Sequence, residues 1–185
     1  MRKLYIVVLF VLLSTSLSYS QQNNLRLTAG ISGGIVMPFN KFSSSPSAEF
    51  DISLDIENDT WLTANFVYTR LAMKSENRTV GGYVEPYLIG TTFKLKKYIL
   101  DDKFFFTGGI GAYTFRDLFT YNLGFDSYYV HDTYTSIGFT GGVGTEFKLN
   151  KFSSLFVKGN YTKVFARDED LNIVNFNLGV RFIVL

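Results

Sequence analysis

The sequence predicts an all-β protein: an eight-stranded antiparallel up-and-down transmembrane β-barrel, preceded by a cleaved signal peptide. Eight segments after residue 20 alternate apolar and polar side chains with a period of two, which is typical of strands with one apolar face. Aromatic residues make up 17% of the chain. No later segment approaches about 18 continuous apolar residues, which excludes transmembrane helices. A barrel is the other architecture that satisfies every backbone hydrogen bond in lipid.

The first twenty residues have the layout of a secretory signal peptide. Arg2 and Lys3 give a basic start, the apolar run LYIVVLFVLL follows, and small residues precede the expected cleavage after Ser20. The apolar run is too short to span about 30 Å of hydrocarbon as an anchor. We therefore expect residues 1–20 to be the signal peptide and 21–185 to be the barrel domain.

Composition excludes several function classes. The chain has no cysteine, so it has no lipoprotein acylation site, disulfide framework or thiolate metal site. Loss of Arg2 and Lys3 with the signal peptide takes the 18 basic side chains to 16, equal to the 16 acidic ones. A neutral mature chain gives no reason to expect nucleic acid as a partner. We also expect no metal and no cofactor.

The first four strands are expected at about 25–37, 48–57, 61–72 and 83–95. In the second segment, the apolar residues Phe50, Ile52, Leu54 and Ile56 alternate with Glu49, Asp51, Ser53, Asp55 and Glu57. The first, third and fourth segments follow the same alternation, with Gly, Thr, Asn or Lys on the polar face. Each segment therefore has one apolar face for lipid and one polar face for the barrel interior.

The last four strands are expected at about 104–115, 136–148, 154–165 and 173–185. The first two contain a local echo, FTGGIG at 106–111 and FTGGVG at 139–144, with the same parity, as neighbouring strands of one barrel require. No helix pattern and no Lys-Ser/Thr pair follows these glycines, so a phosphate-binding loop is disfavoured. Glycines that relieve crowding in a tight barrel are the better interpretation.

The connections fit one topology, with both termini in the periplasm. Starting the first strand there makes four connections external, near 38–47, 73–82, 116–135 and 166–172. Three connections are then periplasmic, near 58–60, 96–103 and 149–153. Long and short loops largely alternate, as outer-membrane barrels require.

Charges and aromatic residues support this topology. The only charged residues on the predicted lipid face of the strands, Arg70, Glu85 and Lys163, fall near the external rim. Two aromatic girdles are expected. The external girdle comprises Tyr68, Tyr83, Tyr87, Tyr113, Tyr161 and Phe165, and the periplasmic one Trp61, Phe104, Phe147 and Phe156.

The predicted polar face carries a set of charged residues, mostly in its periplasmic half: Arg26, Asp51, Asp55, Lys94, Glu146, Lys148, Lys158 and Arg181. An eight-stranded barrel is just wide enough for its side chains to fill. We expect these charges to pair and close the lumen, because unpaired charges there would be costly. The alternative is a narrow porin-like channel for small solutes or ions.

His131 is the only histidine. Some small outer-membrane barrels are lipid A modifying enzymes that use a histidine with a serine and an acidic residue, and Ser127, Asp132 and Ser136 lie near His131 in the sequence. A catalytic triad is defined by geometry rather than adjacency. We interpret His131 as a loop residue and predict no enzymatic activity and no catalytic residues, with the lipid A modifying enzyme as an alternative.

The connection RDLFTYNLGFDSYYVHDTY, at 116–134, is a candidate binding segment. Its alternation suggests a hairpin that extends the flanking strands beyond the membrane with an exposed edge. Tyrosine-rich edges suit protein or glycan ligands. The external-loop binding candidates are Phe119, Tyr121, Phe125, Tyr128 and Tyr129.

The last strand carries a short motif. Asn177, Gly179, Phe182 and Val184 resemble the polar-x-Gly-x-x-aromatic-x-hydrophobic signal by which the barrel assembly machinery of Gram-negative outer membranes recognises its substrates. Leu185 departs from that pattern, which usually ends in an aromatic residue. The resemblance implies that this machinery is a partner during biogenesis.

Residues 25–185 as a whole resemble the OmpA/OmpX-type family of small eight-stranded, porin-like outer-membrane β-barrels. That resemblance implies an integral protein of a Gram-negative outer membrane, in contact with its lipid and lipopolysaccharide, with a structural, adhesive or surface-protective role. The fold-level rival is a secreted lipocalin-like carrier with an apolar interior. The Gly-x-Trp motif of that family is absent, since Asp59 and Thr60 precede Trp61.

Overall fold

The computed structural model of the chain describes residues 26–39, 42–57, 59–71, 82–84, 87–100, 103–123, 126–166 and 170–184. The predicted signal peptide lies outside these residues. The described residues form nine β-strands: β1 (Leu27–Pro38), β2 (Ser45–Glu57), β3 (Thr60–Arg70), β4 (Gly82–Val84), β5 (Tyr87–Ile99), β6 (Phe104–Leu123), β7 (Asp126–Lys148), β8 (Ser153–Val164) and β9 (Leu171–Ile183). Within this part of the chain, no helix is long and apolar enough to cross a membrane.

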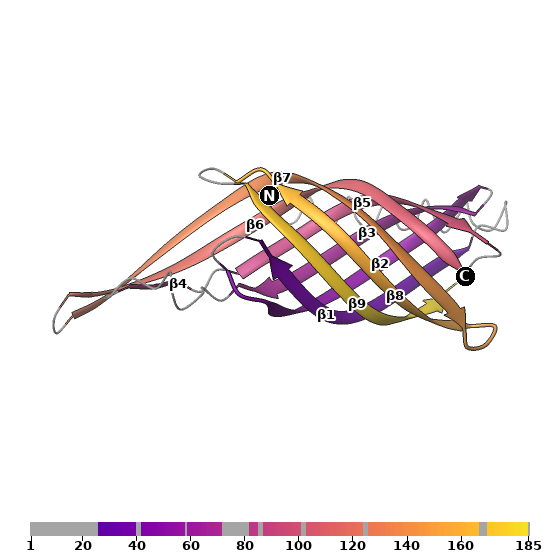
Figure 1. Cartoon of the computed structure of the whole chain (residues 1–185), viewed down its shortest axis with the longest axis horizontal. Coiled ribbons are helices and arrows are strands. Elements are labelled where there is room, and N and C mark those ends of the chain that lie inside the picture. Colours follow the sequence, from indigo (N-terminus) through magenta and orange to yellow (C-terminus); the bar gives the residue numbers. More distant parts are fainter. Residues whose placement is uncertain are drawn as a thin grey trace.

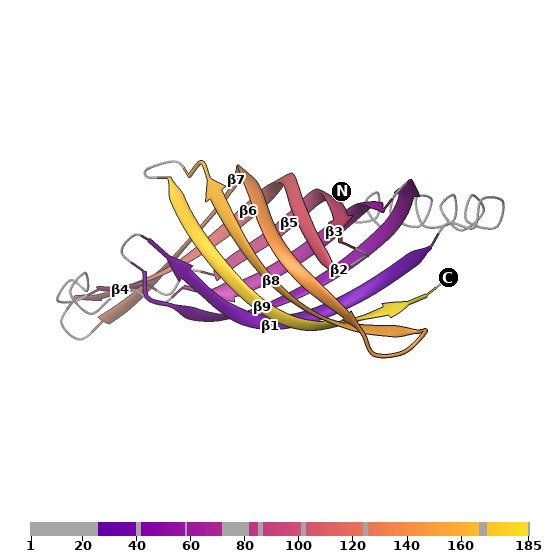
Figure 2. The ribbon, with the colours of Figure 1, turned by 45° about the vertical axis from the view of Figure 1, so that its right-hand side comes forward.

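Eight of these strands form a closed antiparallel barrel. The pairing runs β6-β5-β3-β2-β1-β9-β8-β7, and an additional β6–β7 pairing closes the sheet. Figures 1 and 2 show the strands strongly tilted around the barrel. The first barrel strand pairs with the last over the register Thr28↔Ile183 to Pro38↔Ile173. The predicted up-and-down eight-stranded barrel is therefore confirmed.

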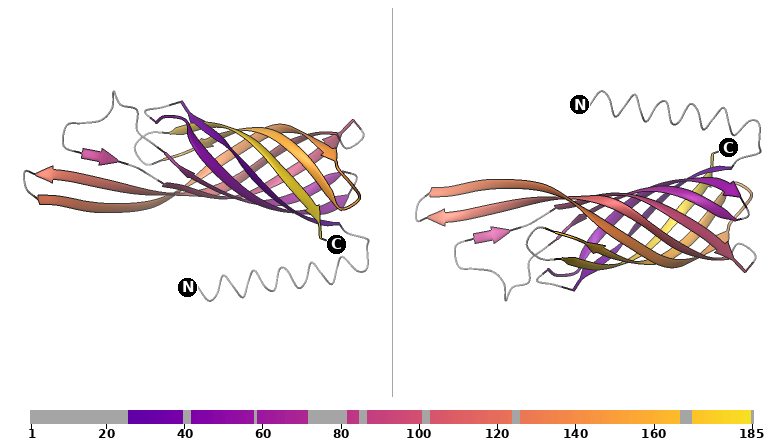
Figure 3. Two further views of the ribbon diagram at one scale, coloured as in Figure 1. Left: turned by 90° about the horizontal axis from the view of Figure 1, so that it is seen from below. Right: turned by 90° about the horizontal axis from the view of Figure 1, so that it is seen from above.

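A long hairpin extends from one end of the barrel (Figure 3). β6 has 20 residues and β7 has 23, and their pairing continues to Leu123↔Asp126. The predicted extension of these two strands into a long hairpin is confirmed by their backbone pairing. One difference from expectation is β4, which pairs with 119–121 of β6 and covers part of that edge. The predicted strand 83–95 is thus divided between β4 and β5, which are separated in the sequence by residues 85–86.

Side chains alternate between the barrel interior and its outer surface, as the sequence predicts. Ile31, Phe93 and Leu178 point outward and are 56 to 59% exposed. Polar residues at the intervening positions, such as Ser53 and Asn65, are buried inside. The two FTGG copies lie side by side, with Gly108 paired to Gly141. An apolar exterior with buried polar side chains inside is the reverse of what a carrier barrel requires.

The predicted aromatic girdles need three corrections. Tyr113 is only 3% exposed and Phe156 is fully buried, so both point into the barrel. Trp61 also faces inward, where its ring packs edge-on against Tyr98 with centroids 6.3 Å apart. The reason is parity, because Phe156 and Trp61 share the face of their strands with buried polar residues. The side chain of Tyr83 lies outside the described residues.

The other predicted girdle residues lie on the outer surface. At the hairpin end of the barrel, Tyr68 stacks on Tyr87 with centroids 6.0 Å apart, and Phe165 packs against Phe139 at 5.8 Å. Tyr161 is also exposed at this end. At the opposite end, the exposed girdle residues are Phe104 and Phe147.

The interior has two zones. Toward the hairpin end, apolar side chains from five barrel strands and from the residue after β3 pack together; this apolar cluster comprises Val36, Leu71, Leu88, Tyr113, Phe115, Val164, Leu171 and Ile173. The rest of the interior is mainly polar and charged. The sequence predicts a polar lumen with its charges mostly in the periplasmic half, and the apolar cluster in the half nearer the hairpin is a difference from that expectation.

Two adjacent glycines differ in the space around them. A Cβ atom on Gly109 would collide with the backbone carbonyl oxygen of Phe93 on the neighbouring strand, whereas a Cβ atom on Gly108 would meet nothing within 4 Å. Gly109 therefore permits the close approach of β5 and β6. Gly108 occupies an open outward position.

Gly109→Val should lower the stability of the folded barrel by about 1 to 3 kcal/mol, because the added side chain overpacks the β5–β6 contact. Urea unfolding of the refolded protein, followed by tryptophan fluorescence, measures this change. Gly108→Val is the matched control and should leave the unfolding midpoint nearly unchanged. Equal effects of the two substitutions would contradict the assigned strand facing.

Candidate functional site

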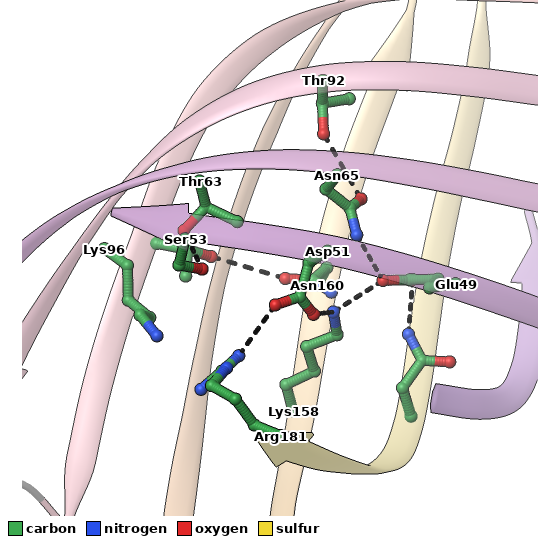
Figure 4. A network of polar contacts seen from close by, with 12 residues as sticks. Glu49, Asp51, Ser53, Thr63, Asn65, Thr92, Lys96, Lys158, Asn160 and Arg181 are labelled. Carbon is green, nitrogen blue, oxygen red and sulfur yellow. Dashed lines mark hydrogen bonds and ion pairs between the residues drawn. The ribbon is translucent and has the colours of Figure 1, made fainter. Parts of the chain in front are cut away.

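Glu49 forms the centre of a buried polar network inside the barrel (Figure 4). Lys158 Nζ lies 2.6 Å from Glu49 Oε2, to which Asn65 also donates a hydrogen bond of 3.1 Å. The side-chain amides of Asn175 and Asn177 each donate to Glu49 Oε1 at 2.5 Å. One carboxylate on β2 thus accepts four contacts from β3, β8 and β9. These charge-assisted bonds hold together strands that are distant in the sequence.

Arg181 forms a second buried group nearer the end opposite the hairpin. Its Nη2 atom lies 3.2 Å from Asp51 Oδ1, and its Nη1 atom pairs with Glu146 Oε2. The Tyr98 hydroxyl and the Ser154 hydroxyl also donate to Glu146. The guanidinium therefore joins carboxylates on β2 and β7, and its planar shape suits this double pairing.

Lys158 connects the two groups. Its ammonium lies between the carboxylates, 2.6 Å from Glu49 and 3.9 Å from Asp51. Figure 4 shows the side chains of Lys158 and Arg181 both reaching the acidic residues of β2. We call the connected set Glu49, Asp51, Asn65, Tyr98, Glu146, Ser154, Lys158, Asn175, Asn177 and Arg181 the lumen network.

Lys96 borders the lumen network among aromatic rings. Its Nζ atom lies 4.7 Å from the ring centroid of Tyr98, 5.1 Å from that of Trp61 and 5.7 Å from that of Phe105. Lys96 also donates a 2.9 Å hydrogen bond to the Tyr98 hydroxyl. The faces of the rings attract the buried cation through their quadrupoles. This arrangement fills the barrel at the end opposite the hairpin.

The structure brings four of the predicted lumen charges together: Asp51, Glu146, Lys158 and Arg181. Lys94 is also buried and lines a small cavity beside the network. The other three differ from the expectation, since Arg26 and Lys148 are exposed and Asp55 is only half-buried. These three residues lie near the open end of the barrel, where strands reach the solvent.

Three contributors were missing from the predicted set. Glu49 lies on the predicted polar face but outside the predicted charge set. Lys96 and Tyr98 are predicted to lie in a connection at 96–103, whereas β5 continues to Ile99. Continuing the alternation beyond Lys94 would have found both, because every second residue from Leu88 to Tyr98 points inward.

The external candidates can be placed only in part. Phe119 and Tyr121 of β6 pair in register with Val130 and Tyr128 of β7. The side chains of Phe119, Tyr121, Tyr128, Tyr129 and His131 lie outside the described residues, as does the whole of Phe125. In the part of the chain that is described, no group of three His, Cys, Asp or Glu residues could hold a metal ion.

Three of the predicted assembly residues lie on β9, on both of its faces, and Val184 directly follows the strand. Asn177 points inward and belongs to the lumen network. Gly179 also faces inward, where an added Cβ would collide with the Ile31 carbonyl oxygen of β1. Phe182 and Val184 are about half exposed. In the folded barrel, the two inward residues therefore also help the closing β1–β9 pair to pack.

Comparisons with known proteins agree with this architecture. No protein-family model matches the sequence. No curated protein matches it either. Among solved structures, Ail, the attachment invasion locus protein of Yersinia pestis, matches with a TM-score of 0.56 and 14% sequence identity, over 85% of this chain and 97% of that chain. A major outer membrane protein from Thermus thermophilus matches with a TM-score of 0.68 and 8% identity, over 87% of this chain and 100% of that one.

At such low identities the likeness concerns the fold alone. In this chain, eight of the described strands pair in a closed antiparallel barrel. The chain has the fold of the small eight-stranded outer-membrane β-barrels.

Proposed function

We propose that the protein is an integral β-barrel of a Gram-negative outer membrane, with a lumen closed to solutes and a surface-binding or structural role for its external hairpin. The observation that carries this proposal is the apolar belt, a set of outward residues with one or more on each of the eight barrel strands. They include Ile31, Phe50, Phe66, Phe93, Ile110, Phe139, Val157 and Leu178, which are 40 to 59% exposed. Such a belt would be an unusually large apolar surface in water. In lipid it is the expected exterior.

The outward charges support the same orientation. The exposed outward charges of the described strands lie near the rims of the barrel: Arg70, Lys97 and Arg116. Lys163 also lies near the end of β8, where it pairs with Asp170 at 3.0 Å. A charge near the rim stays within reach of the polar headgroups, so the free-energy cost of placing it on the lipid face falls toward zero. Glu85, the third charge expected on the lipid face, lies outside the described residues.

The hairpin supports a surface-binding role. It lies at the end opposite the start of β1 and the finish of β9, which is the external end if both termini are periplasmic. Ail is described as an attachment invasion locus protein, and it has been solved in complex with the heparin analogue sucrose octasulfate, with a TM-score of 0.52 to this chain. We assign the proposed contacts with a protein or glycan to the predicted hairpin candidates Phe119, Tyr121, Phe125, Tyr128 and Tyr129.

Other partners follow from the same location. The apolar belt would contact outer-membrane lipid and lipopolysaccharide, and the terminal residues Asn177, Gly179, Phe182 and Val184 would be recognised by the barrel assembly machinery. A narrow channel is less well supported, because the apolar cluster and the lumen network occupy successive levels of the interior. The enzymatic alternative depends on His131, whose side chain lies outside the described residues.

The full-length protein expressed in a Gram-negative host should fractionate with the outer membrane and migrate faster on gels before boiling than after. Leu178→Arg should reduce the heat-modifiable form, because a charge in the middle of the apolar belt costs about 2 to 4 kcal/mol in lipid. Leu149→Arg is the matched control, since Leu149 is similarly exposed but lies in the turn after β7. Soluble periplasmic protein would contradict the proposed location.

Arg181→Met should destabilise the refolded barrel by about 3 to 5 kcal/mol, because Asp51 and Glu146 lose the cation that pairs them. It should not open a conducting path, because the apolar cluster remains. Urea unfolding and planar-bilayer recordings measure the two effects. Lys97→Met, which removes an outward cation, is the control. Conductance steps in the unmutated protein would instead favour the channel.

Replacing residues 118–131 with an Asn-Gly turn should abolish surface binding while preserving the barrel. Arg116 and Thr133 pair in register, so a short turn beyond them can close the hairpin. Binding of outer-membrane vesicles to heparin and to immobilised extracellular-matrix proteins is the measurement. Unboiled gel mobility checks that the shortened barrel folds. Undiminished binding by the shortened protein would assign the contacts to another loop.

A further inference from the structure

A small cavity separates the lumen network from the apolar cluster. Its volume is about 30 Å³. Its lining combines apolar and polar residues; the polar lining comprises Glu49, Asn65, Thr69, Lys94, Asn160, Thr162 and Asn175. Space of this size is sufficient for a water molecule or a monatomic ion. A cavity with so many polar groups is not expected to stay empty.

The polar lining includes a hydrogen-bond donor without a partner. Asn160 is 5% exposed, and its Nδ2 atom has no hydrogen-bond partner. Its Oδ1 atom is already used, because it accepts a 3.4 Å hydrogen bond from Thr107. A buried amide donor left unpaired is costly, so the missing partner is an acceptor. Lys94, a second donor in the lining, is 6% exposed.

Glu49 does not supply the missing acceptor. Each of its carboxylate oxygens already takes two contacts, Oε1 from Asn175 and Asn177 and Oε2 from Asn65 and Lys158. Asn160 Nδ2 is therefore a buried donor for which Glu49 offers no free oxygen. An unpaired donor and a lysine in one lining favour an acceptor ligand over a cation.

The count of buried ionisable side chains agrees with an acceptor ligand. In the described part of the barrel interior, four basic side chains are buried, namely Lys94, Lys96, Lys158 and Arg181. Against them stand the buried carboxylates Glu49 and Asp51 and the largely buried Glu146. The described interior thus holds one more basic side chain than carboxyl groups. A buried charge without a counter-charge is strongly unfavourable.

We propose that the cavity is a binding site for a small monatomic anion such as chloride, held between Lys94 and Asn160. The anion balances the fourth cation and accepts the hydrogen bond from Asn160 Nδ2. It lies beside the apolar cluster, which shields it from the hairpin end. This site concerns the barrel interior and does not depend on what the hairpin binds.

Bromide provides a direct probe. Crystals of the refolded protein soaked in sodium bromide should give an anomalous peak between Lys94 Nζ and Asn160 Nδ2. Asn160→Asp keeps the size of the side chain but places a fourth carboxylate at the cavity, so it should pair with Lys94 and abolish the peak. Absence of a peak in the unmutated protein would overturn the proposal and leave water as the occupant.

Stability in solution provides a second readout. The urea midpoint of the unmutated barrel should be higher in sodium chloride than in sodium gluconate at equal concentration, because an ion that binds only the folded state stabilises it. The difference should disappear in Asn160→Asp. Asn150→Asp, the same change in an exposed turn, should retain it. Equal chloride dependence in both variants would overturn the assignment to this cavity.

Discussion

Closure between the first and last barrel strands is the constraint on which the interior depends. The inward face of β1 carries small residues, and an added Cβ on Gly30 would lie 2.9 Å from the Asp51 carboxylate. A Cβ on Gly34 would collide with Asn177. β1 therefore leaves room for long side chains of its neighbours β2 and β9 to meet across it. The lumen network is the result of this space.

The interior is filled by two different kinds of interaction at successive levels. Near the hairpin, the apolar cluster excludes water through close packing of side chains such as Leu88, Phe115 and Ile173. In the half of the barrel farther from the hairpin, paired charged side chains fill the interior. Their burial is tolerated because they also accept or donate hydrogen bonds. The barrel interior is therefore closed by apolar packing at one level and by paired charges at the other. At their boundary, the side-chain amide of Asn160 has an Nδ2 atom without a hydrogen-bond partner.

Much of the fold could be predicted from the sequence, because side-chain alternation fixes which face of a strand is apolar. The strand positions, the facing and the extended hairpin all follow from that local pattern. The girdle assignments of Trp61 and Phe156 are wrong because both residues have the inward parity of their strands, although they lie at the membrane level of a girdle. The sequence does not predict the apolar cluster, because apolar residues at strand ends, such as Val164 and Leu171, fall where the alternation is short.

The partners in the lumen network were harder to predict, for a different reason. Glu49 and Asn177 are separated by 128 residues, and only the register of the closed sheet brings them together.

The separation of β1 and β9 along the chain also affects the order in which the barrel forms. The β6–β7 hairpin joins neighbouring segments and has a small loop-closure entropy, whereas β1 and β9 must meet across nearly the whole chain. We expect the hairpin to be an early folding nucleus and the β1–β9 seam to be the last pairing to form.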